Sequence, residues 1–148
     1  MSLSNTLSQD VKAALKSGDK TRVSMLRMVN AAIKNREIEK GSAPTDEDVS
    51  AILRSYVKRA RESIDQFSKA GRTDLAEKEK QELAVIQSYL PEELTEEETR
   101  KIISEAISAT GASSPNEMGK VMKAVMARTK GQVDGKLANK LVKEMLEV

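Results

Sequence analysis

The sequence predicts an all-α protein made of two small helical bundles, four helices followed by three. Three observations support this fold class. Apolar residues recur with helical spacing along most of the chain, N-cap residue types precede these stretches, and glycines or prolines follow them. The composition agrees, because 32% of the residues are charged, 2% are aromatic and only 3 are prolines. Such a composition is typical of helical proteins with an aliphatic core.

Four helices are predicted in the first part of the chain, at about residues 3–17, 20–40, 46–70 and 73–90. Long amphipathic helices joined by short turns are typical of an antiparallel bundle. The expected N-caps are Asp19, Thr45 and Thr73, and the expected stops are Gly18, Gly41 and Gly71. The residues expected to face the core include Leu3, Leu7, Val11, Leu15, Leu26, Val29, Ile33, Val49, Leu53, Leu83 and Ile86.

Pro91 marks the predicted boundary between an N-terminal domain, residues 1–90, and a C-terminal domain, residues 91–148. Three short helices are predicted in the second domain. Their expected N-caps are Thr95, Ser114 and Asp134, with Glu98 and Glu117 completing capping boxes and Pro115 in the first helical position. So small a unit has a marginal core, so it should depend on the first bundle or on a partner.

The charge of the chain is unevenly distributed. Residues 1–90 hold 16 Lys/Arg against 13 Asp/Glu, residues 91–111 hold 2 against 6, and residues 112–148 hold 7 against 4. An acidic joint therefore separates two mildly basic parts, which points weakly to anionic partners.

Several kinds of chemistry are excluded by composition. The chain has no cysteine and no histidine, so disulfides, zinc sites built on these residues and histidine-assisted nucleophiles are absent. No nucleotide-binding glycine motif occurs, and no cofactor or metal is expected. No apolar run reaches membrane length and the first residues lack a signal-peptide core, so we expect a cytoplasmic protein without a membrane partner.

The last predicted helix carries lysines on one face. Lys136, Lys140 and Lys143 lie at positions i, i+4 and i+7. They form either an ordinary solvated face or a surface that holds an anion. Lys130 and Gly131 precede the helix start, whose backbone N–H groups can bind a phosphate. Asp134 argues against a phosphate there, because its carboxylate can occupy the same groups.

Methionines in the preceding helix allow two interpretations. Met118, Met122 and Met126 recur every four residues, beside Val121 and Val125. They form either part of the core or an adaptable apolar groove for a partner helix.

Residues 46–70 carry a second basic stripe. Arg54, Lys58 and Arg61 repeat the i, i+4, i+7 spacing. This stripe is either a solvated face, partly neutralised by neighbouring acids, or a surface that follows nucleic-acid phosphates.

Three runs carry a resemblance to a known family: RVSMLRMVNAAIKNREIEKG, FSKAGRTDLAEKEKQELAVIQSYLPEELTEEE and GASSPNEMGKVMKAVMARTKGQVDGKLANKLVKEML. Together they resemble the GatB/YqeY family, and within it the stand-alone YqeY-like proteins. The resemblance implies a four-helix and a three-helix bundle. Its C-terminal part is similar to the tail of the B subunit of the tRNA-dependent amidotransferase, which is implicated in holding the tRNA.

The resemblance also implies a family label, carbon–nitrogen ligase with glutamine as amido-N-donor. Neither the catalytic domain of the B subunit nor the glutaminase subunit is similar to any part of this chain, so no catalytic residue is carried over. The resemblance implies binding of tRNA, or of a tRNA-handling protein complex. The matching basic positions are Lys120, Lys123, Lys130, Lys136, Lys140 and Lys143.

We therefore expect a non-catalytic helical module that binds tRNA or a tRNA-handling complex through its C-terminal bundle. The alternative is a protein–protein interaction module that uses the methionine-rich helix. A third hypothesis, which depends on the resemblance alone, is an auxiliary role in glutamine-dependent tRNA amidation.

Overall fold

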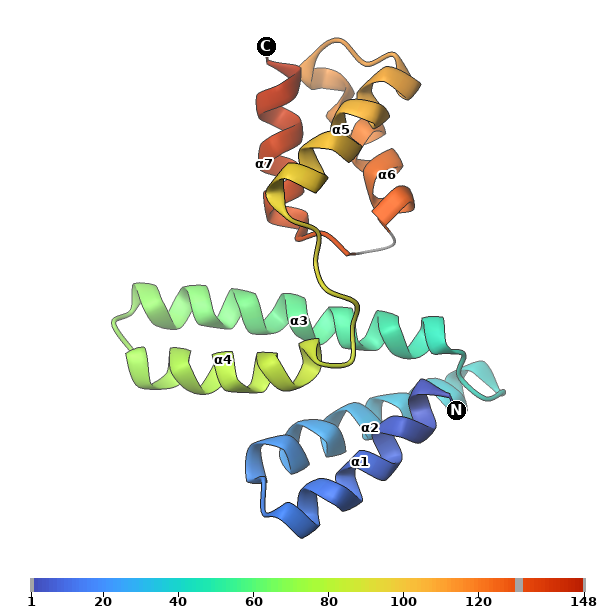
Figure 1. The fold of residues 1–148 in the computed structure, drawn as a ribbon, viewed down its shortest axis with the longest axis vertical. Helices are drawn as coiled ribbons and strands as arrows, with labels where there is room; N and C mark the ends of the chain where they lie inside the picture. The colour runs from blue at the N-terminus through green and yellow to red at the C-terminus, as the bar shows by residue number, and fades with distance from the viewer. Residues whose placement is uncertain (1, 130–131, 148) are drawn as a thin grey trace. The chain divides into compact units, whose positions relative to one another are not determined.

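The computed structural model describes residues 2–129 and 132–147. Within these ranges the chain is helical with no strand, which confirms the all-α fold class (Figure 1). The elements are α1 Leu3–Ser17, α2 Lys20–Lys40, α3 Asp46–Lys69, α4 Thr73–Gln87, α5 Glu96–Thr110, the 3₁₀ turn η1 Pro115–Glu117, α6 Met118–Thr129 and α7 Gly135–Leu146.

The chain divides into two compact units, Met1–Leu90 and Pro91–Val148. In the first, α1 and α2 form one helical hairpin and α3 and α4 form another (Figure 1), and α2 also contacts α3 and α4. Aliphatic side chains from all four helices fill the space between them. Its buried core cluster is Leu7, Met25, Leu26, Val29, Ile33, Val49, Leu53, Val57 and Ile86.

Helix ends in the first unit follow the predicted chemistry in most places. Asp19 caps α2, and Thr45 forms a reciprocal capping box with Asp48 at the start of α3. Gly18 ends α1 with a φ of 75°, a left-handed conformation that glycine adopts without steric cost. Thr73 is not the N-cap of α4: Arg72 holds that position and makes no capping bond. The Arg72 guanidinium instead bonds the Asp74 carboxylate at 3.2 Å, which stabilises the first turn from the side.

A polar network joins three elements of this unit. The Tyr89 hydroxyl donates to Asp10 Oδ2 at 2.6 Å and accepts from Arg22 Nη2 at 2.7 Å. Burial and the bond to Asp10 raise the pKa of Tyr89 to about 12, so the tyrosine stays protonated as a donor. The network therefore fixes the end of α4 against α1 and α2.

The second unit places α5, α6 and α7 around its own core. Thr95 and Glu98 form the predicted capping box of α5, and Gly111 ends that helix with a φ of 69°. The buried core cluster is Ile103, Ala106, Ala112, Val121, Val125, Leu141, Val142 and Leu146.

The start of α6 differs from the prediction. Residues Pro115–Glu117 form a 3₁₀ turn, so the α-helix begins at Met118. The Glu117 carboxylate accepts the backbone N–H groups of Ser113 and Ser114 at 2.7 and 3.3 Å, and the Glu117 N–H donates to the Ser114 carbonyl at 3.0 Å. This i→i+3 bond tightens the first turn before the α-helix is established.

Candidate nucleic-acid interface

Helix α7 is the element that positions the predicted lysine face. Asp134 caps it, because its Oδ1 accepts the backbone N–H of Lys136 at 3.1 Å. That N–H group is one of those that a phosphate at the helix start would need. The cap therefore favours binding by the side of α7 over binding by its first turn. Lys130 and Gly131, which were predicted to assist at the helix start, lie outside the described residues.

Lys136, Lys140 and Lys143 all lie exposed on one side of α7. The opposite side is the buried one, formed by Ala138, Leu141, Val142 and Leu146. At a rise of 1.5 Å per residue the three lysines extend over about 10 Å of the helix. None of the three makes an ion pair within 4.0 Å among the residues that the structure describes. Their ammonium groups are therefore available to an external anion.

The two predicted lysines of α6 lie elsewhere. Lys120 and Lys123 are exposed on the side of α6 opposite the buried Val121 and Val125. They therefore lie on a different helix from the α7 set, and both sets are exposed outside the core that α6 and α7 share. Hydrogen bonds from Ser113 and, to a smaller extent, the charge of Lys120 hold the pKa of Glu117 below its usual value. The structure thus brings three of the predicted lysines together on α7 and places these two on α6.

The arginines of the second unit are engaged in ion pairs, unlike its lysines on α7. Arg100 pairs with Glu96 at 2.9 Å and lies 3.7 Å from Glu144. Arg128 pairs with Glu105 at 3.3 Å. Glu144 is the acid next to Lys143 on α7, and its partner among the described residues is Arg100 of α5 rather than a lysine. This arrangement leaves the lysine face positive.

The methionines of α6 lie at the rim of the core. Val121 and Val125 are completely buried, whereas Met118 and Met122 are only partly buried. Met126 is 38% exposed, so core packing does not describe it. Val121 and Val125 each precede a methionine by one residue, which is a rotation of about 100° around the helix. The valines therefore point more directly at α5 and α7 than the methionines do. The methionine side chains form a partly open apolar edge.

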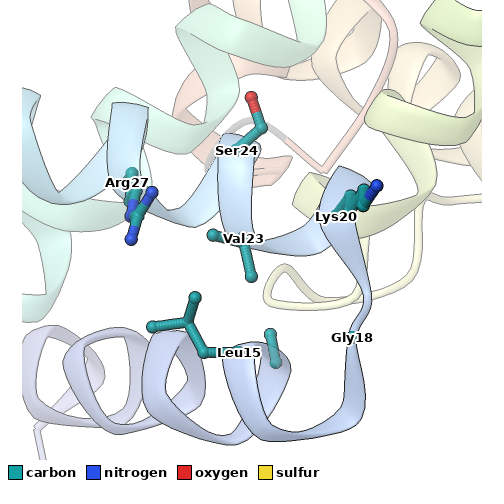
Figure 2. A pocket seen from close by; sticks show the side chains of 7 residues that line it. Leu15, Gly18, Lys20, Val23, Ser24 and Arg27 are labelled. Atoms are coloured by element: carbon teal, nitrogen blue, oxygen red, sulfur yellow. The ribbon is translucent and has the colours of Figure 1, made fainter.

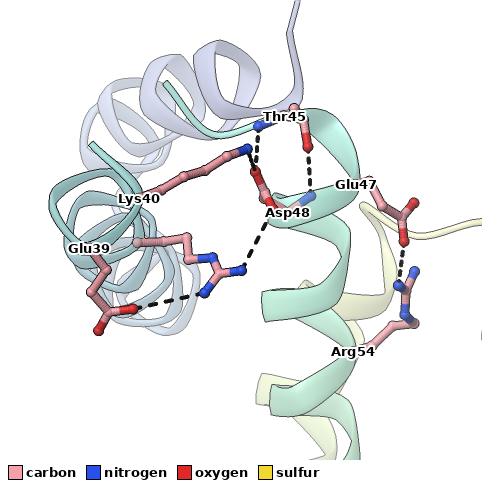
Figure 3. Close-up of polar contacts among 7 residues, drawn as sticks. Glu39, Lys40, Thr45, Glu47, Asp48 and Arg54 are labelled. Carbon is pink, nitrogen blue, oxygen red and sulfur yellow. Dashed lines mark hydrogen bonds and ion pairs between the residues drawn. The ribbon is translucent and has the colours of Figure 1, made fainter. Parts of the chain in front are cut away.

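The basic stripe of α3 has internal partners. Arg54 Nη2 pairs with Glu47 Oε1 at 2.8 Å (Figure 3). Arg61 also has an interaction partner, and the neighbouring Arg59 lies 4.8 Å from the centroid of the Tyr56 ring. The stripe therefore resembles a solvated, partly neutralised surface more than a free cationic one.

Sequence reasoning overlooked a basic surface on the α1–α2 hairpin. Residues 11–36 contain seven basic residues but only one acid, Asp19. A charge count over residues 11–36 alone would have found this imbalance. The count over residues 1–90 concealed it, because many acidic residues follow from Glu37 onward.

The described residues include no group of three His, Cys, Asp or Glu that could hold a metal ion. In the same part of the chain, no helix combines the length and the apolar character that crossing a bilayer requires.

Fold and surface together define a class: a small all-helical protein of two units whose last helix carries exposed lysines on one side. Comparison with known families is consistent with this class. The model of the Yqey-like protein family matches residues 4–146, so the chain belongs to that family.

Curated relatives come from fungi. The chain is 41% identical over 85 residues to "Altered inheritance of mitochondria protein 41, mitochondrial" of Eremothecium gossypii, a match that covers 57% of this chain and 46% of that protein. It is 30% identical over 143 residues to the protein of the same name in Pyrenophora tritici-repentis, covering 95% and 78% respectively. An uncharacterised protein of Schizosaccharomyces pombe is 34% identical over 79 residues, covering 53% and 64%. The chain thus spans about half the length of the Eremothecium relative.

The expectation of a cytoplasmic protein is wrong, because the relatives from Eremothecium and Pyrenophora are named as mitochondrial proteins. The expectation depended on the lack of a long apolar segment, and that feature does not distinguish one cellular compartment from another.

Proposed function

We propose that the chain is a non-catalytic module that binds tRNA, or a tRNA-handling complex, through the lysine face of α7. The single observation that supports this most strongly is a set of three exposed lysines on one side of a helix, Lys136, Lys140 and Lys143, none of which has an ion pair among the described residues. A row of cations on a rigid helix can follow successive phosphates. Structured RNA is recognised largely through its shape and its phosphate backbone. A row of lysines can bind that backbone without contacting the bases.

Salt dependence gives the proposal a quantitative test. Each phosphate neutralised by a lysine contributes about −0.9 to the slope of log K against log salt for a duplex. Three contacts give a slope of about −2.7, so affinity should fall about 40-fold between about 50 and 200 mM salt.

The variant for this test carries Lys136→Gln, Lys140→Gln and Lys143→Gln together. We expect the salt slope to fall by about 2.7 and the affinity for tRNA at low salt to drop roughly tenfold or more. Because these lysines have no ion-pair partner in the described structure, thermal stability should be unchanged. Fluorescence anisotropy with labelled tRNA measures the affinity, and circular dichroism measures the stability.

A matched control removes three lysines from the first unit, Lys58→Gln, Lys78→Gln and Lys80→Gln. All three are exposed, so the net charge changes equally. If both triple variants lose affinity by the same factor, the binding is a non-specific charge effect and the α7 assignment fails. Absence of tRNA binding at low salt defeats the whole proposal.

A second function is favoured by the partly open methionine edge of α6. In that case a partner helix packs beside Met126, and binding is insensitive to salt. Met126→Asp changes an exposed side chain, so it should abolish such binding while the protein remains folded. Salt-resistant binding that survives Met126→Asp excludes this alternative.

A role beside the glutamine-dependent tRNA amidotransferase follows from the family resemblance. It predicts that adding the chain to the complete amidotransferase accelerates amidation of tRNA-bound glutamate or aspartate. An unchanged rate at saturating chain excludes it, while leaving tRNA binding by α7 a separate question.

A further inference from the structure

A groove opens between the end of α1 and the start of α2. It has a volume of about 530 Å³, and Figure 2 shows Leu15 and Val23 facing one another across it from the two helices. Ala14 and Val23 are 3% and 8% exposed and form its floor. Leu15 was predicted to be a core residue, but 51% of it is exposed. The neighbouring Ala14 takes the buried position at this level of α1, so Leu15 is left at the edge of the contact with α2.

Two cations line the groove. Lys20 and Arg27 line it on either side of Val23 (Figure 2). Neither makes an ion pair within 4.0 Å among residues 2–129 and 132–147. Three other basic residues of the segment 11–36 are engaged by acids: Arg22 lies 4.0 Å from Asp10, Lys34 pairs with Glu37 at 3.7 Å and Arg36 with Glu39 at 3.9 Å. The positive charge of the groove therefore comes from Lys20 and Arg27.

The single acid of that segment does not neutralise the groove. Asp19 Oδ1 accepts the backbone N–H of Arg22 at 3.0 Å and caps α2. Lys20 and Arg27 therefore leave the groove positively charged, and a partner that carries carboxylates would complement this charge.

The exposed apolar side chains of the α1–α2 hairpin indicate which kind of partner the groove fits. Four large apolar side chains are exposed in the described structure, and Leu15, Met28 and Ile38 of the α1–α2 hairpin are three of them. Aliphatic side chains do not provide the stacking platforms that single-stranded nucleic acid uses. The apolar floor is also recessed between two helices, whereas a membrane-inserting face projects beyond its cations. A cleft of this kind suits an amphipathic helix.

We propose that the α1–α2 groove binds an acidic amphipathic helix of a partner protein. One aliphatic side chain of that helix packs between Leu15 and Val23, and carboxylates on either side of it pair with Lys20 and Arg27. The two cations are seven residues apart on α2, which is a rise of about 10 Å. The partner helix therefore carries acids two turns apart on one face, with an aliphatic residue between them.

The probe is a synthetic peptide of about 15 residues, long enough to populate a helix, with a central leucine flanked by glutamates two turns apart. Nitrogen-15 NMR spectra of the full chain should show saturable shifts confined to α1 and α2. Leu15→Asp should weaken binding at least tenfold, and circular dichroism should show that this exposed substitution leaves the fold intact. The double variant Lys20→Glu, Arg27→Glu should lose the acidic peptide and bind its lysine counterpart.

Lys80→Glu provides the control, because it reverses an exposed charge on α4 and should leave peptide binding unchanged. The proposal is overturned if no saturable shift appears, or if Leu15→Asp binds the peptide as tightly as the native chain. It is also overturned if tRNA or phosphatidylserine vesicles produce the same Leu15-dependent shifts. A change in sedimentation of the Leu15→Asp protein alone would assign the groove to a second copy of the chain instead. These outcomes are independent of the α7 lysines, so they distinguish this proposal from the proposed function.

Discussion

The stripe on α3 and the face on α7 carry basic residues at the same spacing, i, i+4 and i+7, but in different surroundings. On α3, Arg54 is held by Glu47 at 2.8 Å and Arg61 has an interaction partner. On α7, the three lysines have no ion pair within 4.0 Å in the described part of the chain. The spacing of basic residues alone therefore does not distinguish cations that are paired within the fold from cations that can bind an external anion.

The difference follows from where the acids lie. On α3 the acidic first turn, Asp46 to Asp48, is two turns from Arg54 and can reach it along the same face. On α7, Asp134 caps the helix and Glu144 lies 3.7 Å from Arg100. Glu147, at the end of the helix, makes no ion pair within 4.0 Å with a lysine among the described residues. An acid that serves a cap or another helix leaves the neighbouring lysines positive.

The largest expected effect comes from the core beneath the α7 face. Leu141 is 1% exposed, so Leu141→Ala should destabilise the second unit by about 2–5 kcal/mol. Because that unit is small, it should lose most of its tRNA affinity together with its helicity. Thermal melts followed by circular dichroism, and anisotropy at the same temperatures, measure both.

Leu53→Ala is the matched change in the first unit, where Leu53 is 0% exposed. It should destabilise α3 and its neighbours by a similar amount but leave tRNA affinity in place. If Leu53→Ala removes the affinity as completely as Leu141→Ala does, the α7 face is not the RNA-binding surface and the contrast between the two helices loses its functional meaning.

A smaller effect should follow from giving α7 the kind of acid that α3 already has. Asn139 is exposed and lies three residues after Lys136 and four before Lys143, so Asn139→Glu places a carboxylate within reach of both. We expect a roughly fivefold loss of tRNA affinity and a salt slope smaller by about 1. Asn139→Gln preserves the neutral charge and should bind normally. Equal tRNA affinities for the two variants would show that an acid beside the lysines does not reduce their binding to RNA.

The fold was predictable because local chemistry determines most helix ends. The capping boxes at Thr45 and Thr95 and the left-handed glycines at Gly18 and Gly111 are set by residues within one turn. Thr73 was mispredicted, because a nearby Arg72–Asp74 pair stabilises that turn in another way.

The surfaces were less predictable, because exposure and pairing depend on the other helices. The periodicity that buries Leu7 also includes Leu15, but only the three-dimensional arrangement shows that Leu15 is left uncovered. Similarly, the valines of α6 take the core positions and Met126 is left at the edge. Lysine spacing predicted the α7 face, but whether those lysines were paired depended on Arg100 from α5.

The smallest expected effect tests whether paired charges stabilise the first unit. Asp48 Oδ2 accepts from Lys40 Nζ at 2.6 Å and from the Thr45 backbone N–H at 2.9 Å (Figure 3). The hydrogen bond from Lys40, followed by that from Thr45, lowers the pKa of Asp48 from 3.8 to about 2. Because the folded state has the lower pKa, the stabilisation is present above about pH 4 and is lost as the pH falls toward 2.

Asp48→Asn should therefore unfold at a lower denaturant concentration than the native chain at pH 7, and the two midpoints should converge near pH 2. Lys140→Gln provides the contrasting case, because this lysine lies in the middle of α7, away from both helix ends, and has no ion pair among the described residues. Its midpoint should match the native one at every pH. A gap between Asp48→Asn and the native chain that persists unchanged at pH 2 would mean that the carboxylate charge is not what stabilises this turn. A lower midpoint for Lys140→Gln would show that the α7 lysines contribute to the stability of the fold, which would remove the distinction between the two helices.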